Sequence, residues 1–154
     1  MTRSFAFGLM FCFSVGCGSN GGGAFGMWWD DDGTPVKFIG GDARFTSSGG
    51  SDSYDITGVA HLATVQVQVT APSPIAPQTF VCNQTTTGQL VGVTYYRPDG
   101  GIDFMEQSCT VVLTKAGQIG DTAVGTFEAV INIPGGGTKT ISNGKFNLHV
   151  SKPL

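Results

Sequence analysis

The sequence predicts an all-β protein, an antiparallel β-sandwich of roughly eight to ten short strands in residues 27–154. Three observations predict this class. Short runs alternate between apolar and polar residues, clusters of Gly, Asp, Asn and Pro separate the runs, and no window of about ten residues after residue 26 has helical periodicity. The 24 glycines among 154 residues supply the tight turns that many short strands need.

The clearest strand covers residues 63–70. Val65, Val67 and Val69 share one face, and polar Thr and Gln residues share the other. Residues 125–133 repeat the pattern, and their expected inward set is Phe127, Ala129, Ile131 and Ile133. Each strand is therefore expected to have one buried face and one solvated face.

A hairpin is predicted near the end of the chain, where residues 138–142 and 145–150 flank Asn143 and Gly144. Asn-Gly is the preferred pair for a two-residue type I′ turn, because both positions need positive φ. Phe146, Leu148 and Val150 are then expected to face the core. The other predicted strands are residues 27–30, 36–39, 43–46, 54–60, 79–83, 89–96, 102–105 and 108–114.

The N-terminal segment has the layout of a secretory signal. Arg3 precedes an apolar run over residues 5–15, which is too short to span a bilayer, and Gly16 is a small residue at its end. We therefore expect residues 1–16 to be removed as the chain leaves the cytoplasm. Residues 14–17, Ser-Val-Gly-Cys, resemble the lipobox of bacterial lipoproteins.

The lipobox resemblance implies that Cys17 is acylated, for example with palmitate, and becomes the new N-terminus. Residues 17–26 would then form a glycine-rich tether between a membrane and the domain at 27–154. Gly18 stands where well-studied lipoproteins carry the Asp that favours the inner membrane, which implies a location at the outer membrane or cell surface. The alternative is an ordinary signal peptide followed by an incidental cysteine.

Cys82 and Cys109 remain in the domain, and we expect them to form a disulfide. An exported chain reaches an oxidising compartment, and this pair lacks the C-x-x-C spacing and nearby histidines of a metal site or catalytic thiol. Cys82 shares a face with Phe80, and Cys109 shares one with Val111, so both thiols should point inward. Closing this loop would stabilise the fold by about 3.5 kcal/mol on the chain-entropy model.

The charge balance excludes one class of partner. Charged residues make up 12% of the chain and the formal net charge is −3. Because this chain has no basic patch to neutralise phosphates, we do not expect nucleic acid as a partner. Residues 142–145 match the S-x-x-K pattern of penicillin-binding enzymes, but that pattern needs a helical turn where the hairpin is predicted. We nominate no catalytic residue and expect a protein that is not an enzyme.

Trp28 and Tyr96 form the predicted ligand surface. Adjacent residues on a strand point to opposite faces, and Trp29 and Tyr95 share their faces with apolar neighbours. The outward rings can stack on a glycan or on an envelope protein partner. The expected function is non-catalytic binding or structural interaction at the membrane. The alternatives are a carbohydrate-binding module that uses these rings and, second, a secreted hydrolase.

Asp30 and Asp32 are the candidate calcium ligands, because three successive carboxylates precede the turn residue Gly33. The EF-hand spacing and its closing Glu are absent. A simpler interpretation is a polar hairpin tip whose charges discourage edge-to-edge pairing. No other metal or cofactor is expected.

Three segments carry a broader resemblance: residues 27–35, 125–127 and 141–147. Together they resemble the opening and closing strands of uncharacterised, mostly lipid-anchored bacterial envelope proteins with a single β-sandwich domain. The resemblance spans nearly the whole domain. It implies a fold and a location, and it supplies no catalytic residues.

Replacing Cys17 with Ala should release the protein from membranes, because the acyl chains would lose their attachment atom. Radiolabelled palmitate incorporation and membrane fractionation measure the effect. Cys12→Ala is the matched control, since Cys12 lies in the segment expected to be removed, and it should leave labelling unchanged. Membrane retention of the Cys17→Ala variant would contradict the anchor.

Overall fold

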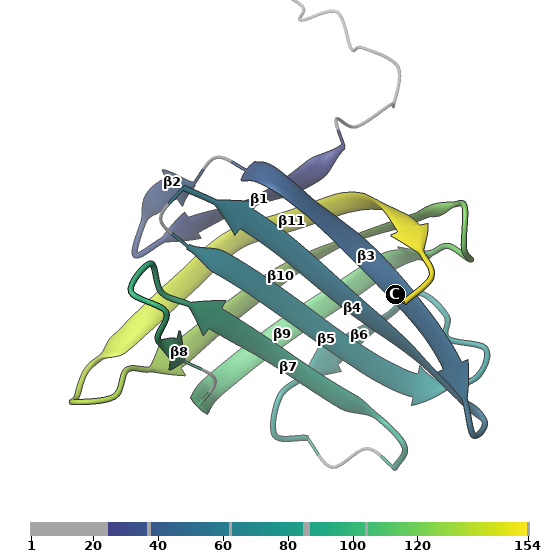
Figure 1. Ribbon diagram of the computed structural model, residues 1–154. Coiled ribbons are helices and arrows are strands. Elements are labelled where there is room, and N and C mark those ends of the chain that lie inside the picture. Colours follow the sequence, from purple (N-terminus) through teal and green to yellow (C-terminus); the bar gives the residue numbers. More distant parts are fainter. Residues whose placement is uncertain (1–24, 37, 62, 85–86, 104, 154) are drawn as a thin grey trace, which may run out of the picture.

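The computed structural model describes residues 25–36, 38–61, 63–84, 87–103 and 105–153 (Figure 1). The expected signal segment, Cys17 and most of the expected tether lie outside this part of the chain. The described residues form strands and turns and contain no helix. The strands are β1 (Gly26–Asp31), β2 (Thr34–Val36), β3 (Phe38–Ser48), β4 (Ser51–Ala60), β5 (Thr64–Pro72), β6 (Gln78–Val81), β7 (Leu90–Tyr96), β8 (Ile102–Asp103), β9 (Met105–Ala116), β10 (Thr122–Asn132) and β11 (Thr138–Ser151).

The all-β prediction is confirmed, but the architecture is closer to a nearly closed barrel than to a sandwich. Hydrogen bonding runs continuously through the order β6-β9-β10-β11-β3-β4-β5-β7-β8, with β1 joined to β11 and β2 joined to β1. A sandwich would divide this order into two sheets. Here a short parallel pairing of β11 with β3 at Val150 and Ser151 joins the two layers. In Figure 1, β3, β4, β5 and β7 cross in front of β9, β10 and β11.

The core lies between the two crossing layers and follows the predicted alternation. Val65, Val67 and Val69 are fully buried, as expected for one face of β5. Ile133, which was expected to face inward, follows the end of β10 and is only partly buried. The largest fully buried side chains include Trp29, Tyr54, Phe80, Phe127 and Phe146.

The predicted hairpin at Asn143 and Gly144 is wrong. Residues 138–151 form the single strand β11, and the pairing register with β10 shifts between Phe127 and Ala129, which marks a β-bulge opposite residues 141–144. Only Asn143 of the pair has positive φ, at 52°, whereas a type I′ turn needs two such residues. Both halves of β11 pair with β10 on the same side, so the chain bulges here and does not reverse.

A type I′ turn occurs instead near the start of the domain sequence, between β1 and β2. Asp32 and Gly33 have φ values of 48° and 80°, and they join β1 to β2 where Asp31 pairs with Thr34. The hairpin expected at the start of the domain is therefore present. Its turn also presents the Asp32 carboxylate to β11, where it accepts a hydrogen bond of 2.7 Å from the Thr140 amide.

Cys82 and Cys109 lie at disulfide distance, as expected. Their Cα atoms are 4.9 Å apart and both side chains are buried. Cys109 belongs to β9 and Cys82 directly follows β6, so the pair joins neighbouring strands of one sheet. The Cys82 amide also donates a hydrogen bond of 2.9 Å to the Cys109 carbonyl.

Two buried tyrosines connect the layers at opposite ends of the barrel. The Tyr54 hydroxyl donates to the Gly117 carbonyl at 2.6 Å, and the Tyr95 hydroxyl donates to Asp31 at 2.9 Å. Tyr95 pairs with Val65 on β5, and Val65 pairs with Gly58 on β4. Gly58 is four residues from Tyr54 along β4, so the two tyrosines lie at different heights in the barrel. Each buried phenol thereby satisfies its donor across the core.

Gly144→Ala should destabilise the fold by about 2–3 kcal/mol, because overpacking a tight contact forces the backbone apart. A Cβ atom at Gly144 would lie 2.3 Å from the Phe127 carbonyl oxygen. Gly40→Ala is the matched control in β3, since a Cβ there would have no atom within 4 Å. Urea unfolding of both variants measures the difference, and equal midpoints would contradict the close approach of β10 and β11.

Candidate functional site

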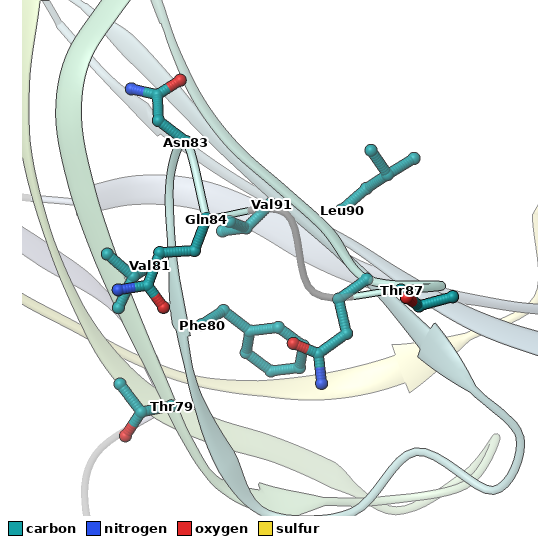
Figure 2. Close-up of a pocket in the computed structure, with 9 residues that line it drawn as sticks. Thr79, Phe80, Val81, Asn83, Gln84, Thr87, Leu90 and Val91 are labelled. Atoms are coloured by element: carbon teal, nitrogen blue, oxygen red, sulfur yellow. The ribbon is translucent and has the colours of Figure 1, made fainter.

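A groove with a volume of about 680 Å³ lies between β6 and β7 (Figure 2). It lies where the barrel fails to close, since β6 pairs with β9 and the first residues of β7 pair with β5. We call it the seam groove. Its lining residues are Thr79, Phe80, Val81, Asn83, Gln84, Thr87, Gln89, Leu90 and Val91.

Two contacts fix the separation of the groove walls. The Gln89 side-chain amide donates to the Gln78 side-chain oxygen Oε1 at 3.0 Å, and the Cys82 sulfur lies 3.7 Å from the Val91 backbone carbonyl oxygen. Because Cys82 is paired with Cys109, this wall is also fixed to β9. The groove is therefore held by side chains where a continuous ladder of backbone bonds would hold a closed barrel.

The chemistry of the seam groove is uncharged. Its described lining residues offer hydroxyl groups, carboxamides and apolar side chains, and none of them titrates near neutral pH. Leu90 is 71% exposed and Phe80 is 1% exposed, so the apolar contact comes from the rim more than from the floor. Figure 2 shows Phe80 and Val91 in the central part of the view, with Thr79 and Thr87 on either side.

The structure places Trp28 and Tyr96 on separate parts of the outer surface. Trp28 lies on β1, which pairs with β11 and β2, whereas Tyr96 lies on β7, which pairs with β5 and β8. Both rings are partly exposed. The Tyr96 hydroxyl donates to Gln66 at 2.6 Å. The two aromatic rings expected to form one ligand surface therefore belong to different layers of the barrel.

Asp30 and Asp32 both have hydrogen-bonding partners within the protein. Asp30 accepts a hydrogen bond of 2.7 Å from the Asn143 side-chain Nδ2, and the second Asp32 oxygen lies 3.3 Å from the Lys139 ammonium. No cluster of three or more potential metal ligands occurs among the described residues. The turn carboxylates thus face an amide and a cation.

A charged cluster that the sequence did not reveal lies beside this turn. Lys139 on β11 forms an ion pair with Asp31, and its ammonium lies 4.7 Å from the centre of the Tyr95 ring. The Lys139 and Asp31 side chains are 16% and 18% exposed. Three strands therefore meet through one cation, one carboxylate and one phenol, a contact between residues up to 108 positions apart in the sequence.

The pKa shifts in this cluster follow from burial and charge. Burial, together with the hydrogen bond to Asp31 and the negative charge of that residue, raises the pKa of Tyr95 to about 12. Burial alone would lower the pKa of Lys139, but the adjacent Asp31 outweighs it and raises that pKa. The hydrogen bond from the Thr140 amide lowers the pKa of Asp32. Partial burial acts in the opposite direction, and the nearby Lys139 lowers the pKa further.

The two histidines lie apart from these features. His61 and His149 are both exposed. The His149 ring stacks on Phe25, with centroids 4.2 Å apart. Neither residue lines the seam groove.

Comparison with known proteins finds no matching family model, no matching curated protein and no matching solved structure. Within the described residues, no helix is long and apolar enough to cross a membrane.

The free energy of unfolding should fall as the pH rises from 10 to 12. The folded protein holds the Tyr54 and Tyr95 phenol protons up to a pKa of about 12, whereas the unfolded chain releases them near 10. Each tyrosine should therefore contribute a loss of about 2–3 kcal/mol over this interval. Urea unfolding at several pH values measures the loss.

Tyr54→Phe and Tyr95→Phe should each make this alkaline decline shallower, and the double variant should show the smallest decline. The comparison uses the slope of the free energy of unfolding against pH. A lower stability of a variant at neutral pH therefore does not affect it. The same slope in the wild type and the double variant would contradict the tyrosine origin of the decline.

Proposed function

We propose that this protein is a non-catalytic, lipid-anchored envelope protein that binds an uncharged ligand in the seam groove. One observation carries the proposal: the described residues of this groove line it with neutral hydrogen-bonding groups and apolar side chains. Its volume of about 680 Å³ lies in the range of small-molecule sites, roughly 300–1,000 Å³.

The lining residues favour binding over catalysis. Acid–base and nucleophilic catalysis need a titratable or activated group within reach of the substrate, and the described groove residues offer none. The groups with shifted pKa values are elsewhere. Lys139 is neutralised by Asp31 and Asp32, and Asp121 by Lys115, so these shifts are explained by ion pairs and hydrogen bonds.

The same residues favour a ligand that is neutral and partly polar. Asn83, Gln84 and Gln89 can each donate and accept hydrogen bonds, and Thr79 and Thr87 add hydroxyl groups. A charged ligand would lose its hydration without gaining an opposite charge from the lining. Leu90 and Val91 supply contact for an apolar part of the ligand.

The anchor is the second part of the proposal, and it rests on the N-terminal sequence. Cys17 would carry the acyl chains, and β1 begins at Gly26. A flexible segment of nine residues spans about 15–18 Å on average. The groove would therefore operate close to the surface of the outer membrane.

Leu90→Arg should weaken ligand binding in the seam groove by about tenfold or more, because it places an unpaired charge at the rim. Ligand-observed NMR with a library of neutral and charged small molecules identifies the binders, and titration measures affinity. The matched control is Val59→Arg, because Val59 is also an exposed strand residue, 41% accessible, on β4.

Neutral compounds should dominate the binders, and Val59→Arg should leave their affinity unchanged. A preference for charged compounds, or equal affinity in the two Arg variants, would count against the seam groove as the binding site.

A further inference from the structure

A second hollow lies on the outer face of β9, β10 and β11. It borders the seam groove, because its residues Thr110 and Val112 on β9 pair with the groove residues Val81 and Thr79 on β6. Its volume is about 340 Å³. We call it the outer shelf. The outward or partly exposed residues that line it are Thr110, Val112, Thr126, Glu128, Asn143 and Lys145.

The bulge in β11 shapes this shelf. Ser142 is partly exposed and Asn143 is exposed, so two successive side chains leave the alternation and face outward. The Asn143 amide is oriented by its hydrogen bond to Asp30, at 2.7 Å. Gly144, with no side chain, allows β10 and β11 to approach closely beneath the hollow.

Trp28 borders the outer shelf on β1. Trp28 pairs with Lys145 on β11, Lys145 pairs with Thr126 on β10, and Thr126 pairs with Val112 on β9. These residues therefore form one row across the sheet. Side chains in such directly opposed pairs lie next to one another, with Cβ atoms about 4.5–5.5 Å apart. Trp28 faces outward because its neighbours on both sides, Met27 and Trp29, fill the core.

The polar groups of the shelf are available to a ligand. Both the Glu128 and the Lys145 side chains are exposed. Among the described residues, neither the Glu128 carboxylate nor the Lys145 ammonium has an ion-pair partner. One negative and one positive charge leave the shelf with no net preference for an anion or a cation. An amide and two threonine hydroxyls add neutral donors and acceptors.

We propose that the outer shelf binds a neutral β-1,4-linked oligosaccharide, with one pyranose ring against Trp28. The indole offers an apolar face for the C–H face of a sugar ring, and the Glu128, Asn143 and Lys145 side chains offer bonds to its hydroxyl groups. An exposed, shallow sheet face fits an extended chain, which β-1,4 linkage gives. This proposal does not rest on the proposed ligand in the seam groove, which is the neighbouring site across β6 and β9.

Cellotriose and chitotriose are the test probes, titrated into the purified full chain. The protein has two tryptophans, and Trp29 is only 1% exposed, so a saturable fluorescence change reports mainly on Trp28. We expect at least one trisaccharide to bind at millimolar concentration. Trp28→Ala should weaken that binding by about tenfold or more, measured by calorimetry, and Glu128→Gln should weaken it by a smaller factor.

Two controls separate this site from others. Tyr96→Ala removes an outward aromatic ring of the other layer and Leu90→Arg alters the seam groove, and neither should change trisaccharide affinity. Failure of both trisaccharides to bind would overturn the proposal, as would binding that Trp28→Ala leaves intact. Loss of binding in Leu90→Arg would assign the sugar to the seam groove and would also overturn it.

Discussion

The structure depends on the pairing of β11 along both of its edges. One edge pairs with β10 from Thr138 to His149, and the other pairs first with β1 and then with β3. This single strand therefore joins the layer that contains β9 and β10 to the layer that contains β4 and β5. Without the short parallel contact at Val150 and Ser151, the described strands would divide into two separate sheets.

The alternation of apolar and polar residues was sufficient to predict most strands and their inward faces. Val65, Val67 and Val69 needed no tertiary information, because a period of two fixes the face once one side is buried. The same rule predicted that Trp28 faces outward and Trp29 inward. Local sequence failed at Asn143 and Gly144, where the pair that favours a tight turn instead forms a bulge, because pairing with β10 continues on both sides of it.

The candidate sites could be predicted only in part, because they depend on which strands become neighbours. The seam groove exists because β6 and β7 do not pair, and no local pattern in either strand indicates that gap. Lys139 and Asp31 are 108 residues apart, so only the fold brings them together. Trp28 was recognised as an outward ring, but its companions on the outer shelf come from β9, β10 and β11 and not from Tyr96.

The pairing of Cys82 with Cys109 has a consequence for the seam groove. Cys82 lies between the groove residues Val81 and Asn83 and touches the carbonyl of Val91, while Cys109 is fixed within β9. A covalent bond at this position restrains one wall of the groove only where thiols are oxidised. In a reducing environment the same wall would keep its hydrogen bonds, including the one from the Cys82 amide to the Cys109 carbonyl, but would lose its covalent link to β9. The rigidity of the groove therefore depends on the redox state of the compartment in which the chain resides.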